Sequence, residues 1–459
     1  MTSFFERFEP ILRFLPEVRN PEVQPPLQKK IFWTGLALIL FFTMGQISLI
    51  GIESVFGQQP EAFQLILASE IGTLITVGIG PIVLASIILQ LLVGGGLIKA
   101  DLTDPKEKAR FTGTQKLLAI LLSFFEGAAY LGFGLPGVGF IQAVPGMFLW
   151  VVLQIAIGSI ILLYLDEVVS KHGIGSGIGL FIAAGVSGQF FWLVFRPPSE
   201  LDAGGRIFIA LSTLLGGQFI QTLIALSPII FALVIFFVVV FAEGIHVNIP
   251  ITIGRRGFGG RFPVKFLYVS NMPVILAVAL FANIHLWATL AAQVPVLGQA
   301  LTGLSWAVTS PTFGGSLSLV ENLLLRGITP SIGGELVQAF AYVLVLIAAC
   351  IVFGKFWVEL GGQGSEKVAE QLQRAGMQIP GFRRDPRIMQ KVLDRYIPPI
   401  TILGSAFVGV LAAFSDLTTA SLVSGTGILL TVGIVYRLYE ELAKAQLMEA
   451  HPLLKRLLG

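Results

Sequence analysis

The chain has 459 residues, of which 54% are apolar and only 12% are charged, and its formal net charge is +3. Its mean hydropathy of +0.84 is far above that of soluble domains. This excludes a water-soluble protein and places the chain in the membrane class. The single cysteine, Cys350, excludes an intramolecular disulfide and a cysteine metal cluster.

The N-terminal segment, residues 1–30, is charged and proline-rich and has no central apolar run. We therefore expect no cleavable signal peptide, so that the first apolar run is its own insertion signal. Further on, a short apolar helix is expected at residues 62–69, directly before a long apolar stretch that several glycines and Pro81 interrupt. Interrupted helix within hydrocarbon is tolerated where it is buried in protein or lines a water-filled cavity. This stretch therefore predicts passage through the membrane.

Ten apolar runs are long enough to cross about 30 Å of hydrocarbon at about 1.5 Å per residue. They are residues 31–52, 71–98, 117–135, 146–165, 174–195, 219–242, 267–290, 336–358, 397–414 and 419–439. With a cytoplasmic N-terminus, 27 of the 30 Lys and Arg residues fall on the cytoplasmic side. This asymmetry follows the positive-inside rule. We therefore predict an all-α integral membrane protein of ten transmembrane helices, with both termini in the cytoplasm.

The ten spans divide at a polar outer segment into two halves of five, and because five is odd, the halves are inverted relative to each other. Inverted-repeat membrane proteins have their pathway at the interface between halves. The expected parts are a cytoplasmic N-terminal segment (1–30), a first half (31–195), an outer connection (196–218), a second half (219–441) and a cytoplasmic tail (442–459).

Two cytoplasmic loops are unusually long and basic. Residues 244–266 alternate apolar residues around a glycine-rich tip, which predicts a β-hairpin. Residues 359–396 predict two short helices, the first capped by Ser365 and the second by Asp385. Their basic residues are Arg255, Arg256 and Arg261 on one loop, and Arg383, Arg384, Arg387, Lys391 and Arg395 on the other. These charges suit either lipid headgroups or an acidic partner such as ribosomal RNA, and the predominance of arginine favours a partner.

The outer segment 291–335 is rich in Gly, Ser and Thr and is expected to fold back over the outer face. The motif GIGSGIG at 173–179 superficially suggests a dinucleotide loop, but it opens an apolar span and follows no strand. Its glycines instead allow close approach of helices, with Ile174 and Ile178 one turn apart on the same face. Ile79 and Val83 repeat this spacing in the second span, although any buried helix can carry such pairs.

Glu126 is the only carboxylate deep inside a predicted span, and intramembrane acids suggest a functional role. A proton relay would need a second titratable group at the same depth, so a hydrogen-bonded contact between helices is favoured. No catalytic triad, zinc-ligand spacing or phosphate loop is present in the sequence, and we expect no enzyme activity, cofactor or metal.

Four segments are specific enough to indicate a protein family. They are EIGTLITVGIGPIVLASIILQLLVGGG (70–96), GIGSGIGLFIAAGV (173–186), RFPVKFLYVSNMPVILAVALFANI (261–284) and SGTGILLTVGIVYRLYEEL (424–442). They closely resemble the SecY family, the central subunits of protein-conducting channels, in its archaeal form, and the resemblance covers nearly the whole chain. It implies a plug helix that closes an outer funnel and a ring of apolar side chains at mid-membrane.

Carried over by motif, the resemblance assigns four groups of residues. The implied plug is Ala62, Phe63, Gln64, Leu65, Ile66, Leu67, Ala68 and Ser69. The implied pore ring is Ile79, Val83, Ile174, Ile178, Ile275 and Leu430. The implied polar contacts of a lateral gate, between spans two and three and spans seven and eight, are Glu126 and Asn283, whereas Leu84 replaces the Thr common in the family. The implied ribosome-docking residues are Arg255, Arg256, Arg261, Arg383, Arg384 and Arg387.

The resemblance further implies a multi-pass protein of the cell (plasma) membrane that passes unfolded secretory chains and releases apolar segments into membrane lipid. The implied partners are a SecE-type (gamma) subunit, an archaeal beta-type subunit, and the ribosome with a nascent chain bearing a signal sequence. The alternative is a secondary transporter with inverted repeats, which shares the span count and the broken helices but needs a specific substrate or ion site at the midplane.

Overall fold

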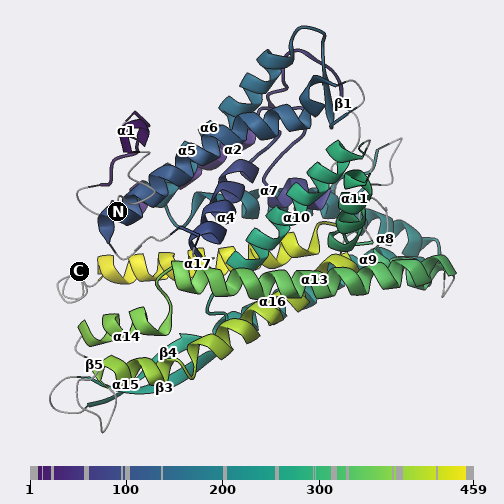
Figure 1. Cartoon of the computed structure of the whole chain (residues 1–459). Helices are drawn as coiled ribbons and strands as arrows, with labels where there is room; N and C mark the ends of the chain where they lie inside the picture. Colours follow the sequence, from purple (N-terminus) through teal and green to yellow (C-terminus); the bar gives the residue numbers. More distant parts are fainter. Residues whose placement is uncertain are drawn as a thin grey trace.

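The structure is a computed structural model. It describes the chain except residues 1–8, 13, 22–24, 56–60, 95–96, 99–103, 136–137, 200–203, 254–257, 293, 295, 312–317, 327–329, 375–376, 379–385, 420–421 and 451–459. Figure 1 shows α2, α5 and α6 grouped on one side of the molecule and α13 and α16 on the other, with α4 and α10 between them. The short helix α1 and the C-terminal end of α17 lie at the same end of the molecule.

The described residues of the N-terminal segment and the first half together form seven α-helices, one 3-10 turn and two short strands. They are α1 (Glu9–Leu12), α2 (Leu27–Gln46), β1 (Ile52–Val55), α3 (Glu61–Ile66), α4 (Gly80–Gly94), α5 (Pro105–Tyr130), η2 (Gly132–Gly134), β2 (Ile141–Ala143), α6 (Phe148–His172) and α7 (Gly177–Phe195). The antiparallel pair β1–β2 was not expected from the sequence. Its strands are only four and three residues long, too short to show an alternating pattern.

The second half carries its long helices together with three strands. They are α8 (Arg206–Leu215), α9 (Phe219–Gly244), β3 (His246–Ile253), β4 (Phe258–Lys265), α10 (Met272–Ala291), α11 (Leu297–Val308), α12 (Leu319–Arg326), α13 (Pro330–Leu360), α14 (Ser365–Arg374), β5 (Met377–Gln378), α15 (Pro386–Leu393), α16 (Ile397–Thr419) and α17 (Gly425–Ala450). Within the segment expected only as an outer connection, α8 forms a helix that packs on α9.

Within the part of the chain that the structure describes, seven helices are long and apolar enough by themselves to cross a membrane. They are α2, α6, α7, α9, α10, α13 and α16. The expected second, third and tenth spans correspond to α4, which has 15 residues, and to α5 and α17, which have 26 each. Lys and Glu residues in α5 and α17 lower the mean hydropathy of these two helices.

Several span boundaries differ from the prediction. The second span was expected from residue 71, but α4 begins only at Gly80 and residues 71–79 form turns. The ninth span was predicted to end at residue 414, whereas α16 continues to Thr419 and α17 starts six residues later than expected, at Gly425. The ninth and tenth spans differ because the buried Asp416 carboxylate accepts hydrogen bonds from Tyr342 and Thr426. These bonds allow polar residues to stay inside the α16–α17 pair.

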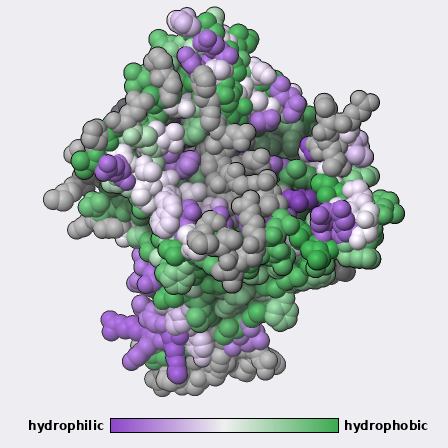
Figure 2. Space-filling model, turned by 90° about the vertical axis from the view of Figure 1, so that its right-hand side faces the viewer, coloured by the Kyte–Doolittle hydropathy of each residue, from purple (hydrophilic) through white to green (hydrophobic). Residues whose placement is uncertain are grey.

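The main apolar core lies between the two halves and joins residues of α2, α3, α4, α7, α10, α13, α16 and α17. Large apolar side chains are also exposed along the helices, for example Phe237 and Phe241 of α9. Figure 2 shows hydrophobic side chains over broad areas of one face of the molecule, with hydrophilic side chains gathered at its edges. A surface of this kind suits a surrounding of lipid.

The predicted hairpin in residues 244–266 is confirmed, because β3 and β4 pair antiparallel from His246↔Lys265 to Ile253↔Phe258. The second basic loop joins it, since β5 pairs with β3 at Thr252↔Gln378 and Ile253↔Met377. Two short helices, α14 and α15, form as predicted in the second loop. Ser365 was expected to be the N-cap of the first of these helices. It is instead the first residue of α14, and its hydroxyl contacts Asp394. Asp385 lies outside the described residues.

Candidate pore and plug

Apolar side chains from four helix segments meet between the two halves. Ile79, Val83, Ile275 and Leu430 are at most 5% exposed and belong to one buried cluster, and Ile178 packs half-buried against it. Their elements are the start of α4, α7, α10 and α17. Branched alkyl side chains therefore converge from both halves, as the ring prediction requires.

Ile174 lies apart from this cluster. It is buried in the turn between α6 and α7, and its amide donates to the Thr34 hydroxyl of α2 at 3.1 Å. The equal spacing of the two isoleucines predicted a shared helix face, but α7 begins only at Gly177. Because Ile174 precedes the helix, the spacing rule does not apply to it.

The expected plug packs directly onto the beginning of α4. The Ile79 amide donates to the Leu67 carbonyl at 2.8 Å, so the last turn of the plug is hydrogen-bonded to a residue of the ring. Gly78 has a φ of +59°, and a Cβ at this position would lie 2.2 Å from the Leu67 oxygen. Only glycine fits there.

The plug helix is shorter than expected, since α3 covers Glu61–Ile66 and Ala68 has a φ of +48°. Its apolar residues Phe63, Ile66 and Leu67 are buried in the same cluster as the ring. The Phe63 ring lies 5.9 Å from the His285 ring of α10. On its other side, His285 is hydrogen-bonded to the Ser305 hydroxyl of α11 at 3.1 Å. Ala62 lies in α3, and its side chain is not among those described.

Two hollows border the ring and the plug. A cavity of about 770 Å³ is lined by Val83, Ile178 and Ile275 together with polar residues of α4, α5 and α14. A second cavity, of about 560 Å³, is lined by Gln64, Leu65, Ala68 and Ser69 of the plug and by residues of α2 and α7. The ring therefore borders the first hollow and the plug borders the second.

The predicted gate residues Glu126 and Asn283 are buried, and the structure shows no hydrogen bond between them. Glu126 Oε2 lies against Gly80, 3.0 Å from where a Cβ would stand, and Oε1 has no hydrogen-bond partner among the described residues. The Asn283 amide donates to the Ala279 carbonyl of its own helix at 2.9 Å. Leu84 is half-buried on α4 and, as a leucine, offers no polar group. Both predicted gate residues are therefore buried polar groups, and their assignment to a lateral gate stays a prediction.

Comparison with known proteins decides the family. The SecY family profile matches residues 73–439 of this chain. The SecY translocase subunit of Methanothermobacter thermautotrophicus is 44% identical, with 100% of each chain covered. This chain belongs to the SecY family. SecY proteins are translocase subunits, and a ten-helix, two-half membrane fold and a role as a protein-conducting channel subunit, not an enzyme, are therefore confirmed.

Solved SecY-type structures agree with this fold. A structure described as a protein-conducting channel superposes with a TM-score of 0.81 at 42% identity, covering 97% of this chain and 98% of the other. The Sec61 channel in a canine ribosome–channel complex from the endoplasmic reticulum gives a TM-score of 0.78 at 41% identity, with the same coverage.

The basic loops of this SecY-family chain lie at one end of the molecule, beyond the long helices (Figure 1). Arg387 is exposed on α15, and Arg261 lies on β4 with a side chain that is not described. The other predicted docking residues, Arg255, Arg256, Arg383 and Arg384, lie outside the described residues. Lys265, at the base of the hairpin, contacts both Glu440 carboxylate oxygens of α17 at 2.7 Å.

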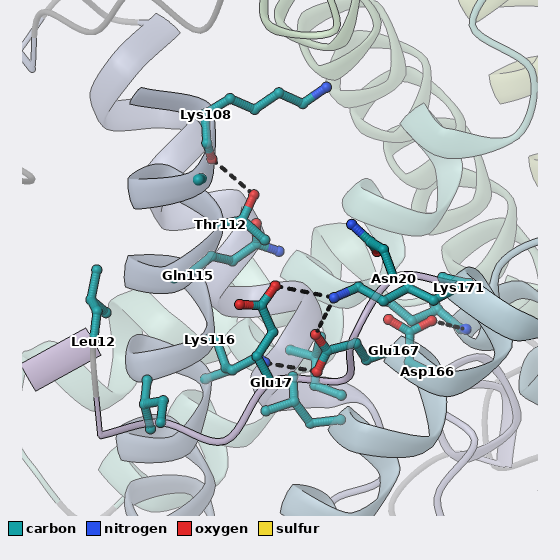
Figure 3. Close-up of a pocket in the computed structure, with 18 residues that line it drawn as sticks. Leu12, Glu17, Asn20, Lys108, Thr112, Gln115, Lys116, Asp166, Glu167 and Lys171 are labelled. Atoms are coloured by element: carbon teal, nitrogen blue, oxygen red, sulfur yellow. Dashed lines mark hydrogen bonds and ion pairs between the residues drawn. The ribbon is translucent and has the colours of Figure 1, made fainter. Parts of the chain in front are cut away.

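A charged cluster near the C-terminal end of α6 was not predicted from the sequence. Glu167 of α6 lies between Lys116 of α5, at 2.7 Å, and Lys171, at 2.9 Å, and Lys171 also contacts Glu17 at 3.1 Å (Figure 3). These residues line a cavity of about 550 Å³ that the N-terminal segment borders. The i, i+4 spacing of Glu167 and Lys171 was a local signal, but only the fold brings Lys116 and Glu17 to them.

Proposed function

We propose that this chain passes unfolded secretory polypeptides outward through the apolar ring and releases apolar segments sideways into lipid. The observation that carries the proposal is the seat of the plug, in which a buried ring residue, Ile79, is hydrogen-bonded to the plug at Leu67. A closed pore of this kind needs a movable part fixed to its narrowest point by bonds that can break.

The ring suits a substrate of arbitrary sequence. Branched alkyl side chains exclude water and ions when they are in contact, and they fit around a peptide without specific hydrogen bonds. A charged side chain in the ring would hold water and would bind particular sequences. The buried Ile79, Val83, Ile275 and Leu430 carry no polar group that could do either.

The side exit runs between α4 and α5 on one side and α10 and α13 on the other. In the closed arrangement α4 packs on both α10 and α13. A Cβ at Gly94 of α4 would lie 2.6 Å from the Phe356 ring of α13. Separating these helices opens the core to lipid, and the hydrophobic free energy of an apolar segment of about 20 residues favours its exit.

We further assign the chain to the plasma membrane with cytoplasmic termini, on the asymmetry of its basic residues. The ribosome binds the two basic loops, which the β3–β5 pairing holds together as one surface. This chain is similar to the Sec61 channel that is described in a canine ribosome–channel complex. This similarity supports the ribosome as a partner.

A small membrane partner of the SecE type binds the apolar groove between α7, α9 and α17. This groove, of about 590 Å³, is lined mainly by apolar side chains such as Phe190, Phe236 and Val435. It spans both halves, so one lipid-embedded helix across it holds them together. The archaeal beta-type subunit is assigned on the family resemblance alone.

The ring is tested by replacing Ile79, Ile275 and Leu430 together with glycine in purified channel reconstituted into proteoliposomes. Loss of the apolar contact should raise the resting ion leak at least several-fold, because water can then fill the constriction. The matched control is Ile157→Gly on α6, a side chain 44% exposed on the outside of the molecule.

The rival secondary transporter predicts a different outcome. In that case the ring variant keeps its low leak, and the liposomes show saturable uptake of a small solute that Glu126→Gln abolishes. This result would overturn the proposed pore.

A further inference from the structure

Two carboxylates, the half-buried Asp166 and the buried Asp416, hold the first turns of α7 and α17, one helix from each half. Asp166, near the end of α6, accepts the Ile178 amide at 2.9 Å. Asp416, near the end of α16, accepts the Thr426 amide at 2.7 Å. Each amide belongs to the second residue of its helix, a position that an N-cap side chain ordinarily serves. In both halves the acceptor for this amide comes from the preceding helix, and in α17 the Ser424 hydroxyl in addition accepts the Gly427 amide at 3.3 Å.

The two helix starts share a local sequence, Ser-Gly-x-Gly, at residues 176–179 and 424–427. A Cβ at Gly177 would lie 2.5 Å from the Asp166 Cα, and one at Gly425 would lie 2.4 Å from the Asp416 amide nitrogen. Both helix starts therefore press against the backbone of the preceding helix, and the first glycine of each motif makes this approach possible.

The second glycine of each motif lies at the contact between the two helices. A Cβ at Gly179 would lie 3.5 Å from Ile434 of α17, and one at Gly427 would lie 3.0 Å from Val186 of α7. In the alignment of the two helices, Gly427 corresponds to Gly179 and Ile434 corresponds to Val186. The contact of Gly179 with Ile434 therefore becomes the contact of Gly427 with Val186 when the two helices are exchanged. The capping arrangement thus occurs twice, related by an approximate two-fold axis.

Both helix starts carry residues of the predicted ring. Ile178 is itself the residue whose amide Asp166 holds, and Leu430 lies one turn beyond Thr426. Uncapped helix starts leave N–H groups unpaired and place partial positive charge in a low-dielectric interior. Asp416 also accepts the Tyr342 hydroxyl of α13 at 2.7 Å and contacts the Thr426 hydroxyl, so α17 is fixed to two other helices.

We propose that Asp166 and Asp416 are a matched pair of positioning residues that set the height and rotation of Ile178 and Leu430 in the resting seal. The inference rests on the ring assigned under the proposed function. The carboxylates touch no translocating chain; they act through the helix starts that they cap.

The experiment uses Asp166→Ala and Asp416→Ala in the full-length chain, purified with its native membrane partners and reconstituted into proteoliposomes. Amide hydrogen exchange of peptides containing Ile178 or Thr426 should rise roughly five- to tenfold at the altered cap. The resting ion leak should rise several-fold in the same preparation. Asp166→Asn, which keeps an acceptor oxygen for the Ile178 amide, should restore most of the protection and of the seal.

The matched control is Glu167→Ala, because Glu167 is the neighbour of Asp166 on α6 but bonds to Lys116 and Lys171 and caps no helix. It should lower thermal stability without opening the seal. Should Asp166→Ala fold poorly, Asp166→Glu keeps the charge, displaces the oxygen by one methylene and should still raise the leak.

Ile178→Gly serves as the reference for the ring. If Ile178→Gly leaks while both alanine variants stay sealed with unchanged exchange, the positioning role is overturned and the ring stands. If Ile178→Gly stays sealed, the ring assignment itself fails, and the link from the caps to the seal fails with it.

Discussion

A single glycine decides how the proposed plug meets the proposed pore ring. Gly78 adopts a φ of +59°, and this conformation turns the chain so that the next residue, Ile79, donates its amide to the Leu67 carbonyl. The left-handed conformation costs other residues on the order of 1 kcal/mol or more. The seal therefore depends on a backbone bond as well as on apolar side chains.

Gly78→Ala should loosen the plug. The added Cβ would lie 2.2 Å from the Leu67 oxygen and 2.8 Å from the Ala68 oxygen, so the plug must move away or the backbone must strain by about 1–3 kcal/mol. We expect the resting ion leak of reconstituted channel to rise about 5- to 30-fold. Gly185→Ala is the control, because a Cβ there meets nothing within 4 Å. Equal ion leak in the two variants would contradict the proposed position of the plug against Gly78.

At the scale of elements, the two basic loops form one surface because of a two-residue strand. The pairing of β5 with β3 joins Met377 and Gln378 to a hairpin that begins more than 100 residues earlier in the chain. Val247 and Val264 of the hairpin pack into an apolar cluster with α14 and α15. A rigid base of this kind suits the binding of a large partner, because few side chains must be ordered on contact.

Arg383→Glu should weaken ribosome binding at fixed salt. Each lost Arg–phosphate contact removes a charge-assisted bond and lowers the slope of log affinity against log salt by about 0.7–0.9. Binding of the detergent-solubilised channel to ribosomes, titrated at several salt concentrations, measures both quantities. Arg326→Glu is the control. It changes the net charge by the same amount as Arg383→Glu, but it lies on the predicted outer side and should leave ribosome binding unchanged. Unaltered affinity in Arg383→Glu argues against docking at this loop.

At the scale of the whole molecule, the halves meet along α7 and α17 on one side and along α4, α10 and α13 on the other. The helix starts at the first contact are each capped from within their own half, by Asp166 and Asp416. Near the second contact lies the buried Glu126, whose Oε1 has no hydrogen-bond partner among the described residues. Because a buried carboxylate with an unpaired oxygen is costly, an opening that hydrates Glu126 is favoured at the second contact. The halves should therefore separate at α4 and α13 and stay joined at α7 and α17.

A cross-link between α4 and α13 tests this direction of opening. Gly94→Cys with Phe356→Cys, in a chain with Cys350→Ala, places two thiols at a close helix contact. Oxidation should block integration of an apolar segment into lipid, and reduction should restore it, as measured by protease protection and alkaline extraction. Each single cysteine variant is the control. Undiminished integration in the oxidised pair would exclude exit between these helices.

The sequence by itself determined the membrane class, the span count and the hairpin, because hydropathy and short-range alternation are local properties; the orientation stays a prediction from the charge asymmetry. It also predicted a plug next to the breaks of the second span. It did not predict the start of α4, the length of α16 or the position of Ile174, since each depends on a partner distant in the chain, such as Leu67, Thr426 or Thr34.

Only the tertiary structure decided which residues of the predicted sites lie together. It brought Ile79, Val83, Ile275 and Leu430 into one cluster, and it directed the Asn283 amide to the Ala279 carbonyl of its own helix. It also revealed that Asp166 and Asp416 perform the same task in the two halves. Spans of apolar residues are interchangeable to the lipid that surrounds them, so the choice of neighbours is made by glycine contacts and buried polar bonds between helices.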